Sequence, residues 1–538
     1  MQRSMVTYGG YTLPCLTAQA VVVGSGCAAL NAADCLAAQG MTDILLVTED
    51  FCAGTSRNTG SDKQTYYKLS LCGEDGDSVG ELARTLYAGG GVHGDLALAE
   101  AACSVRCFMK LVEAGVPFPT NEYGEYAGYK TDHDPRQRAT SAGPLTSRMM
   151  TEALARLVRG WGIPVLQPYL AVQVLTWAGR AVGLLALNLA ELDAPHRGWT
   201  LLCAGQLALA TGGPASLYAD RVYPHSQAGM SSLYLTAGAA ADNLCHWQYG
   251  LASTDFRWNV SGTYQQVLPR YVLEDGREFL PQALGDATRA LAQVFLKGYE
   301  WPFDSAKAGG SSQVDLAVAA ATAAGHAVAL DFSRNPQGFR WDALSPEARD
   351  YLGRSGARQD TPYARLQHMN PDAIQLYADH DIDLSYQPLH IAVCAQHANG
   401  GAAVDAHWQS TLPGLYVCGE AAGTFGLYRP GGSALNATQV GGLRAAEAMA
   451  AQRIAPQPQA LQAALPQILP WLKACEAGLK RAEGPCATAL DAPQQRRMSD
   501  VAAQRRNPEA MADLLAQVRQ DQQALWASAR LTPRDLPA

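Results

Sequence analysis

The sequence predicts an α/β protein, and three stretches far apart in the chain carry this prediction. Ala20–Asp50 reads as a strand, a glycine turn, an Ala-rich helix and a second strand. Ala208–Gly213 ends an apolar strand in a glycine turn, and Leu412–Ala450 reads as strand, turn, glycine-rich loop and helix. Because a long segment of different character separates the last stretch from the others, we expect a split domain with an insertion.

Composition bounds the class of protein before any motif is considered. The chain has 538 residues, 48% of them hydrophobic and 17% charged, which is typical of a large globular enzyme. A net charge of −8 argues against nucleic-acid binding, and no stretch approaches the roughly 18 apolar residues of a membrane span. The thirteen cysteines are scattered without a CxxC pair, so we expect reduced thiols, no metal site and a cytoplasmic location. The first twenty residues hold no apolar run typical of a secretory signal.

The first βαβ unit has the pattern of a dinucleotide site. Gly24 allows the tight turn, Gly26 lets the backbone approach a pyrophosphate at the helix N-terminus, and Ala29 permits close packing of helix and strand. Glu49, with Asp50 beside it, ends the second strand, where an acid can accept the ribose hydroxyls. The alternative, an ordinary βαβ crossover, leaves the glycines and the acid unexplained.

Two further segments are candidates for cofactor contact. The polar loop 52–68 follows the acid directly, and its small polar residues suit a pyrophosphate or a polar ring edge, although a plain surface loop is the alternative. Later in the chain, a predicted hairpin at 170–189 and the glycine turn after Ala210 offer close backbone approach. The candidate residues in these segments are Ser56, Thr59, Gly60, Ala171, Thr211 and Gly212.

The rest of the chain divides by composition. Trp and Tyr are dense from Trp247 to Pro281, and these aromatics either line a pocket or form a core. Beyond Leu412, a Gly-Glu turn and the start of a helix offer Gly419, Glu420, Ser433, Ala434 and Leu435 to a cofactor. We expect a cofactor domain in two parts, 1–249 and 391–452, a capping domain at 250–390, and a helical region at 453–538.

The motifs, taken together and in order, resemble the flavoprotein family of fumarate reductases, succinate dehydrogenases and L-aspartate oxidases. VVVGSGCAALNAA with TED is similar to the family's dinucleotide fingerprint, and ALATGG to its ATGG. PGLYVCGEAAG is similar to its PGLYAAGE segment, RPGGSALNATQVGG to its RLGGNSLLDALVFG, and RRMSDVAAQRRNPEAMADLLAQV to the start of its C-terminal helices.

This resemblance implies FAD as the cofactor and a split Rossmann-like FAD-binding domain with an inserted α+β capping domain. It implies that Gly24, Gly26 and Glu49 hold the ADP half, that Glu420 contacts the ribityl chain, and that residues 433–435 lie at the pyrimidine edge of the flavin. Relatives that bind FAD covalently use a histidine in a loop similar to SRNTGSDK, which has none here, so FAD is expected to be non-covalent. Arg429 matches the family arginine that clamps a substrate carboxylate.

The other substrate anchors of the family are missing. Gly250 stands in WQYGLAS where the family has a histidine, and QHANGG puts Gln396 on another family histidine with His397 one step on. The family's proton-donating arginine has no counterpart, because Gln266 lies nearest and Arg270 is the possible substitute. Losing two charge-assisted contacts of about 1.5–3 kcal/mol each corresponds to about two to four decades of affinity for a dicarboxylate.

We therefore predict an FAD-dependent oxidoreductase that reduces or forms a carbon–carbon double bond next to a carboxylate or carbonyl, in a substrate other than fumarate. Arg429 would polarise that group, and His397, with Tyr249, Tyr264 or Arg270, would move the proton. Alternatives are an amine, amino-acid or hydroxy-acid dehydrogenase or oxidase, and an electron-relay subunit. The expected partners are a small-molecule substrate and an unidentified electron donor or acceptor.

Overall fold

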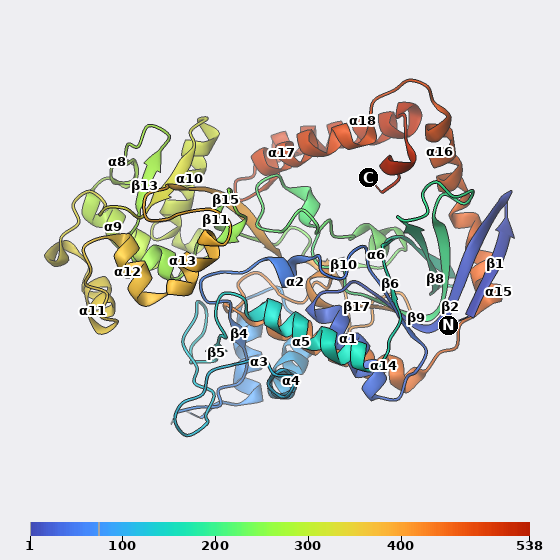
Figure 1. Cartoon of the computed structure of the whole chain (residues 1–538), viewed down its shortest axis with the longest axis horizontal. Coiled ribbons are helices and arrows are strands. Elements are labelled where there is room, and N and C mark those ends of the chain that lie inside the picture. Colours follow the sequence, from blue (N-terminus) through green and yellow to red (C-terminus); the bar gives the residue numbers. More distant parts are fainter. Residues whose placement is uncertain (1, 74–75, 538) are drawn as a thin grey trace.

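The computed structural model describes residues 2–73 and 76–537 and contains two main β-sheets, each packed with its own helices. The eight-stranded sheet lies at one end of the molecule and a five-stranded sheet at the other, and the helices near the C-terminus run along one side from the smaller sheet to the larger (Figure 1). This mixed architecture is the α/β class that the sequence predicts.

The eight-stranded sheet has the order β6-β3-β2-β9-β8-β7, with β1 on β2 and β17 on β9. Its strands are β1 (Gln2–Tyr8), β2 (Tyr11–Val23), β3 (Ile44–Val47), β6 (Val165–Leu166), β7 (Tyr169–Trp177), β8 (Arg180–Asn188), β9 (Trp199–Leu209) and β17 (Leu415–Val417). Strands β2, β3 and β9 are runs of apolar residues, as expected of parallel strands covered on both faces.

The central parallel strands end in register. Val23 pairs with both Val47 and Leu209, and Val417 pairs with Leu209 on its other side. The glycine turn after β2, the acid after β3 and the turns after β9 and β17 therefore meet at one edge of the sheet. This is the edge at which ligands bind in open α/β sheets.

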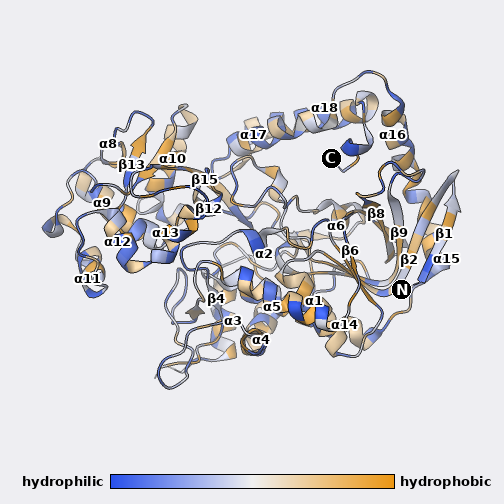
Figure 2. Cartoon of the chain, in the orientation of Figure 1, coloured by the Kyte–Doolittle hydropathy of each residue, from blue (hydrophilic) through white to orange (hydrophobic). Residues whose placement is uncertain are grey.

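Helices cover both faces of this sheet. On one face α1 packs against α14 and α5, and α14 packs against α4. These helices show both hydrophobic and hydrophilic stretches (Figure 2), and α1 is buried on all sides from Cys27 to Leu36. On the other face α15 and α16 bury a cluster of leucines with Trp199. The helices and short strands of this part are α1 (Cys27–Ala38), α2 (Thr55–Asn58), β4 (Tyr66–Tyr67), α3 (Val79–Ala88), α4 (Gly94–Glu113), β5 (Ala139–Thr140), α5 (Thr146–Gly160), α6 (Ser232–Thr236), β10 (Ala241–Asp242), β16 (Gly401–Ala402), α14 (Ser433–Gln452), α15 (Pro458–Ala464) and α16 (Leu469–Lys480).

We call residues 247–398, which hold the five-stranded sheet, the capping region. Its strands have the order β12-β11-β15-β14-β13 and are antiparallel. They are β11 (Trp247–Ser253), β12 (Trp258–Asn259), β13 (Arg270–Leu273), β14 (Val328–Asp331) and β15 (Leu389–Ala398). The helices are α7 (Thr263–Gln266), α8 (Leu280–Leu284), α9 (Ala287–Leu296), α10 (Ser312–Ala323), α11 (Pro346–Arg354), α12 (Pro362–Met369) and α13 (Pro371–Ala378).

Four aromatic side chains of the capping region lie in its core. Trp258, Tyr264, Tyr271 and Tyr377 are all buried in one apolar cluster that is separate from the core of the larger sheet. Of the two interpretations that the sequence left open for 247–281, the structure supports the core for Trp258, Tyr264 and Tyr271, because all three are buried among aliphatic side chains of one cluster.

The final helices, α17 (Asp491–Ala502) and α18 (Pro508–Ser528), join the two ends of the molecule. Arg496 of α17 forms an ion pair with Asp220 at 2.7 Å, and Ser499 accepts a hydrogen bond from the backbone N–H of Asp220 at 3.0 Å. Within residues 2–73 and 76–537, no helix is long and apolar enough to cross a membrane. The same residues contain no group of three or more His, Cys, Asp or Glu side chains that could hold a metal ion.

Candidate functional site

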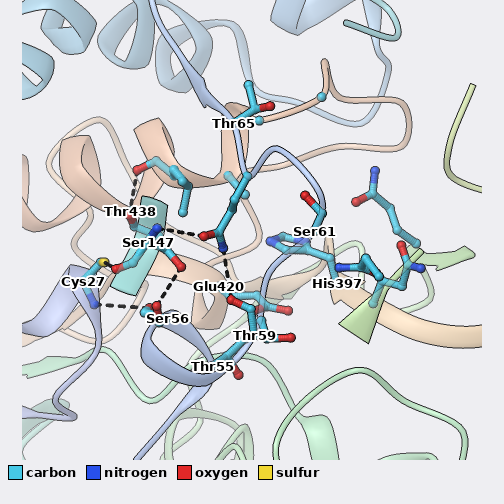
Figure 3. A pocket seen from close by; sticks show the side chains of 18 of the residues that line it. Cys27, Thr55, Ser56, Thr59, Ser61, Thr65, Ser147, His397, Glu420 and Thr438 are labelled. Carbon is cyan, nitrogen blue, oxygen red and sulfur yellow. Dashed lines mark hydrogen bonds between the residues drawn. The ribbon is translucent and has the colours of Figure 1, made fainter. Parts of the chain in front are cut away.

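A cavity of about 1270 Å³ lies where the carboxyl edge of the parallel strands faces the capping region. Its wall includes the turn after β2, the end of β3, the turn after β9 and the start of α14, and on the other side Tyr299, Trp301 and Tyr351 of the capping region. In the view of Figure 3, Cys27 and Ser56 lie on one side of Glu420 and His397 lies on the other. The cavity therefore extends from the dinucleotide fingerprint past Glu420 to His397.

The fingerprint end is shaped by backbone. Gly24 has φ +119°, and a Cβ atom there would lie 2.4 Å from the carbonyl oxygen of Ala210, so only glycine fits. Gly26 is the N-cap residue of α1 and has no side chain to cap the helix; the N–H of Cys27 donates to Oγ of Ser56 at 3.3 Å, and the next N–H groups of the first turn are left for a ligand. Glu49 lines the cavity with its side chain exposed there, and partial desolvation by the surrounding protein raises its pKa above the usual range.

A second acid lies at the middle of the cavity. Glu420 accepts hydrogen bonds from the Tyr223 hydroxyl and, at 2.8 Å, from the backbone N–H of Ala398. Burial raises the pKa of Glu420 to about 7. Beyond it, α14 begins after Gly432 without a side-chain cap, and Ala434 and Leu435 line the cavity there.

Most of the cofactor residues that the sequence predicts line this cavity. They are Gly24, Gly26, Glu49, Asp50, Ser56, Thr59, Ala171, Thr211, Gly212, Gly419, Glu420, Ala434 and Leu435. Ala29 instead packs beneath Gly24, Gly60 packs beneath the Trp258 ring, and the buried Ser433 is not part of the wall. These three are neighbours of the wall and support it from behind.

Several wall residues were not predicted from the sequence. Gln227 donates to the carbonyl of Thr211 at 2.7 Å, and Ser147 donates to the carbonyl of Ser56 at 2.7 Å. Both stand in polar segments without a recognisable motif, so no local signal identifies them. Gln248 precedes an aromatic residue in WQYGLAS, and this Gln-aromatic pair is the signal that could have found it.

Arg429 dominates the charge at the far end of the cavity. Its Nη2 donates to Oε1 of Gln248 at 2.6 Å, while its buried Nε has no partner within the described residues. Burial lowers the pKa of Arg429 to about 10, so the guanidinium remains charged at neutral pH. The unused donors of Arg429 can bind a carboxylate or a carbonyl oxygen.

His397 lies beside Arg429, and its ring is held at one nitrogen. Nδ1 of His397 is 3.0 Å from Oδ1 of Asn399, whose amide nitrogen donates to the carbonyl of Leu427 at 3.3 Å. Because that donation directs Oδ1 of Asn399 at the ring, Nδ1 carries the proton and Nε2 is the acceptor. Burial and the charge of Arg429 hold the pKa of His397 well below its usual range.

The structure places the three other candidates for the proton away from the cavity. Tyr249 is buried and donates to the hydroxyl of Tyr218 at 3.0 Å. Tyr264 is buried in the core of the capping region and donates to the carbonyl of Ala373 at 2.9 Å. Arg270 forms ion pairs with Asp331 at 2.7 Å and Glu278 at 3.3 Å. This corrects the sequence-based expectation: all three side chains make structural contacts and none belongs to the cavity wall.

The wall fits FAD. Backbone turns without side chains at Gly24, Gly26 and Gly419 admit a pyrophosphate, and Glu49 can accept ribose hydroxyls. The buried hydroxyl of Thr55, which has no partner among the described residues, lies at the same end of the cavity. At the other end the N–H groups of α14 favour negative charge on an isoalloxazine ring.

Comparison with known proteins agrees with this fit. Residues 19–435 match the protein family described as FAD binding domain. L-aspartate oxidase of Streptomyces coelicolor is 27% identical over 76% of this chain, and L-aspartate oxidase of Mesorhizobium japonicum is 29% identical over 65% of it. The matched segments span 64% and 60% of those two relatives.

Solved structures share the fold. A quinol-fumarate reductase with menaquinol molecules is 17% identical, with a TM-score of 0.75 over 97% of this chain and 87% of that chain. A single-residue mutant of the E. coli quinol fumarate reductase FrdA is 18% identical, with a TM-score of 0.72 over 97% of this chain and 86% of that chain.

Proposed function

Because this chain belongs to the FAD binding domain family of flavoprotein oxidoreductases, we propose that it reduces or forms a carbon–carbon double bond next to a carboxylate or carbonyl, in a small substrate other than fumarate. The family match and the relatives confirm the sequence-based predictions of the flavoprotein family, the fold class, the cofactor FAD and an FAD-dependent oxidoreductase. The direction of the reaction, the electron partner and the substrate belong to the proposal.

The choice of substrate rests on one observation, the surroundings of Arg429. Its buried Nε has no partner within the described residues, and its neighbours are the amide of Gln248 and the neutral imidazole of His397 instead of further cations. A four-carbon dicarboxylate needs compensation at both ends, since a buried carboxylate without a cation loses its hydration and gains little in return. A substrate with one carboxylate or carbonyl next to the reacting carbons meets this site without an unpaired charge.

The protein's own groups have distinct tasks in this proposal. FAD, when bound, supplies the hydride acceptor or donor. Arg429 binds and polarises the carboxylate or carbonyl, and Nε2 of His397 takes up the proton in the oxidative direction. Trp301 and Tyr299 cover the cavity from the capping side and exclude water.

The test is an anaerobic reoxidation experiment. The flavin of the purified protein is reduced chemically and mixed with fumarate and with a panel of larger enoates and enones, and the return of flavin absorbance is followed. Reoxidation by a larger alkene and not by fumarate supports the proposal. Fast reoxidation by fumarate contradicts the substrate argument, and no response to any alkene contradicts the reaction type.

The acceptor nitrogen of His397 favours a second candidate, the oxidation of an amine or amino acid. A neutral imidazole beside Arg429 can take a proton from a substrate nitrogen while the arginine holds the carboxylate. The two relatives above are named for the oxidation of L-aspartate. Hydrogen peroxide released from amino acids or hydroxy acids in air, without any response to alkenes, would favour this candidate.

A further inference from the structure

Strand β15 carries one extra residue at the substrate end of the cavity. Gln248 of β11 pairs with His397 and Tyr249 pairs with Ala395, so Gln396 has no partner on the opposite strand. Consecutive residues of a regular strand point to opposite faces, but a bulge of this kind re-aims a side chain. As a result both Gln396 and His397 line the cavity.

The amide of Gln396 has a defined orientation. The indole N–H of Trp301 donates to its Oε1 at 2.8 Å, and because an indole nitrogen is only a donor, Oε1 has to face Trp301. The other end of the amide, Nε2, is buried and has no partner within the described residues. A buried N–H without an acceptor is costly, so a ligand is the natural source of that acceptor.

Trp301 is itself held by a buried ion pair. Lys297 and Asp315 are both fully buried, 2.8 Å apart, and Nζ of Lys297 also donates to the carbonyls of Glu300 at 3.1 Å and Trp301 at 2.8 Å. These contacts hold the backbone of the loop that carries the indole ring. Contacts within the capping region therefore fix the orientation of the Gln396 amide before a ligand binds.

Gly250 completes the arrangement. A Cβ atom at this position would lie 2.7 Å from Nε2 of Gln396, so the absence of a side chain at residue 250 makes room for the amide. The sequence shows Gly250 and Gln396 as two separate departures from the family pattern. In the structure the two are linked, because the missing side chain at Gly250 of β11 leaves room for the side chain of Gln396 of β15.

The charges on the cavity wall limit which substrate groups the Gln396 amide can bind. Apart from Arg429 and His397, the basic side chains on the described cavity wall are all exposed. They are Lys63, Lys130, His133 and Arg354. Arg354 is also paired with Asp350 at 2.7 Å. A second carboxylate placed at Gln396 would therefore meet only the neutral N–H of the amide. Arg429, which holds the first carboxylate, is the one cation of the described wall that is not exposed to solvent.

We propose that Gln396 is a specificity-determining residue whose Nε2 donates to an uncharged carbonyl oxygen of the substrate while Arg429 binds its only carboxylate. This inference rests on the proposed function and names its substrate class: half-amides of dicarboxylic acids and keto acids, including amino acids with a side-chain amide. Trp301 and Lys297 are positioning residues, since they act on the substrate through Gln396.

The experiment compares matched pairs that differ in one charge. Fumaramate and fumarate test the alkene reaction against reduced flavin, and asparagine and aspartate test amine oxidation against oxidised flavin. Binding is measured separately, by anaerobic calorimetry of succinamate and succinate with the reduced holoenzyme. Two variants are tested: Gln396→Leu removes the donor, and Trp301→Phe keeps a ring but removes the indole N–H. The control is Gln375→Leu, at an exposed glutamine of the capping region.

The half-amide should be preferred to the diacid by about tenfold or more, in reaction and in binding. Gln396→Leu should lose about tenfold in affinity for succinamate and little for succinate, Trp301→Phe should lose part of the preference, and the control should keep all of it. A parent protein that prefers the diacid overturns the inference, as does a preference that both variants retain with full FAD content.

The two proposals can fail separately. Reaction with an alkene whose rate and affinity do not depend on residues 396 and 301 overturns this inference and leaves the proposed function standing. Binding of succinamate that depends on Gln396, in a protein whose flavin responds to neither substrate pair nor to the wider alkene panel, supports this inference and contradicts the proposed function.

Discussion

Nδ1 of His397 lies 3.0 Å from Oδ1 of Asn399, and this contact determines which nitrogen of the imidazole is left for a substrate. Asn399 is buried and its amide is oriented by the carbonyl of Leu427. The ring also makes a T-shaped contact with Phe425, with centroids 4.5 Å apart. His397 is therefore held as a neutral ring with Nε2 as an acceptor, which suits a base.

Replacing His397 by Ala should lower turnover by about 10²- to 10⁴-fold, the usual contribution of a positioned acid or base, while FAD remains bound. The measurement is single-turnover flavin absorbance together with FAD content. His390→Ala is the matched control, because His390 is on the same strand and is exposed. Unchanged turnover in the His397 variant would remove this residue from the mechanism.

Replacing Asn399 by Asp should move the acid limb of the pH–rate profile to higher pH. A carboxylate beside Nδ1 favours the imidazolium, so the pKa of His397 rises from its depressed position and the base is lost at a higher pH. The profile of kcat/KM between about pH 5 and 9 measures this. An acid limb that does not move between the two proteins would mean that another group sets it.

Replacing Arg429 by Lys should raise KM for the substrate by roughly tenfold to a hundredfold, because an ammonium keeps the charge and loses the planar fork of donors. The contact of Arg429 with Gln248 is lost as well. Arg340→Lys, at an exposed side chain paired with Asp342, serves as the control. Equal KM values for parent and variant would show that Arg429 does not bind the substrate.

Replacing Gly24 by Ala should abolish FAD binding. The added Cβ would lie 2.4 Å from the carbonyl oxygen of Ala210, and φ of +119° is strained for alanine. FAD content by absorbance and the melting temperature report the effect. Gly94→Ala is the control, since a Cβ there meets nothing within 4 Å; full FAD content in the Gly24 variant would contradict the assigned turn.

Replacing Glu100 by Gln should flatten the dependence of stability on pH. Burial raises the pKa of Glu100 to about 8, so the neutral form is favoured by folding. Its contribution is fully present below the unfolded pKa and is lost as pH rises through about 8, with a slope of at most about 1.4 kcal/mol per pH unit.

Urea unfolding of the FAD-loaded protein at about pH 5, 6.5 and 8 measures this, and the variant should be the more stable protein at the highest pH. Glu113→Gln, at an exposed position near the end of the same helix, controls for the loss of a carboxylate. Parallel curves for the parent and Glu100→Gln proteins would mean that the Glu100 carboxyl is ionised in the folded state.

The sequence by itself determined the cofactor half of this protein. The turn at Gly24, the acid at Glu49 and the helix that starts after Gly432 are each encoded within a few residues, since a strand, a turn and a helix follow from local periodicity and glycine placement. Parallel strands then bring these local features to one edge without further information.

Only the tertiary structure decided the substrate half. The contact between Trp301 and Gln396 joins residues far apart in the chain, and it depends on a bulge between β11 and β15 that no local pattern reveals. The same holds for Tyr264, whose aromatic ring suits a pocket or a core equally well until its neighbours are known. The physical reason is that side-chain direction, burial and unpaired hydrogen-bond donors are properties of packing between distant segments, and one-dimensional periodicity contains none of them.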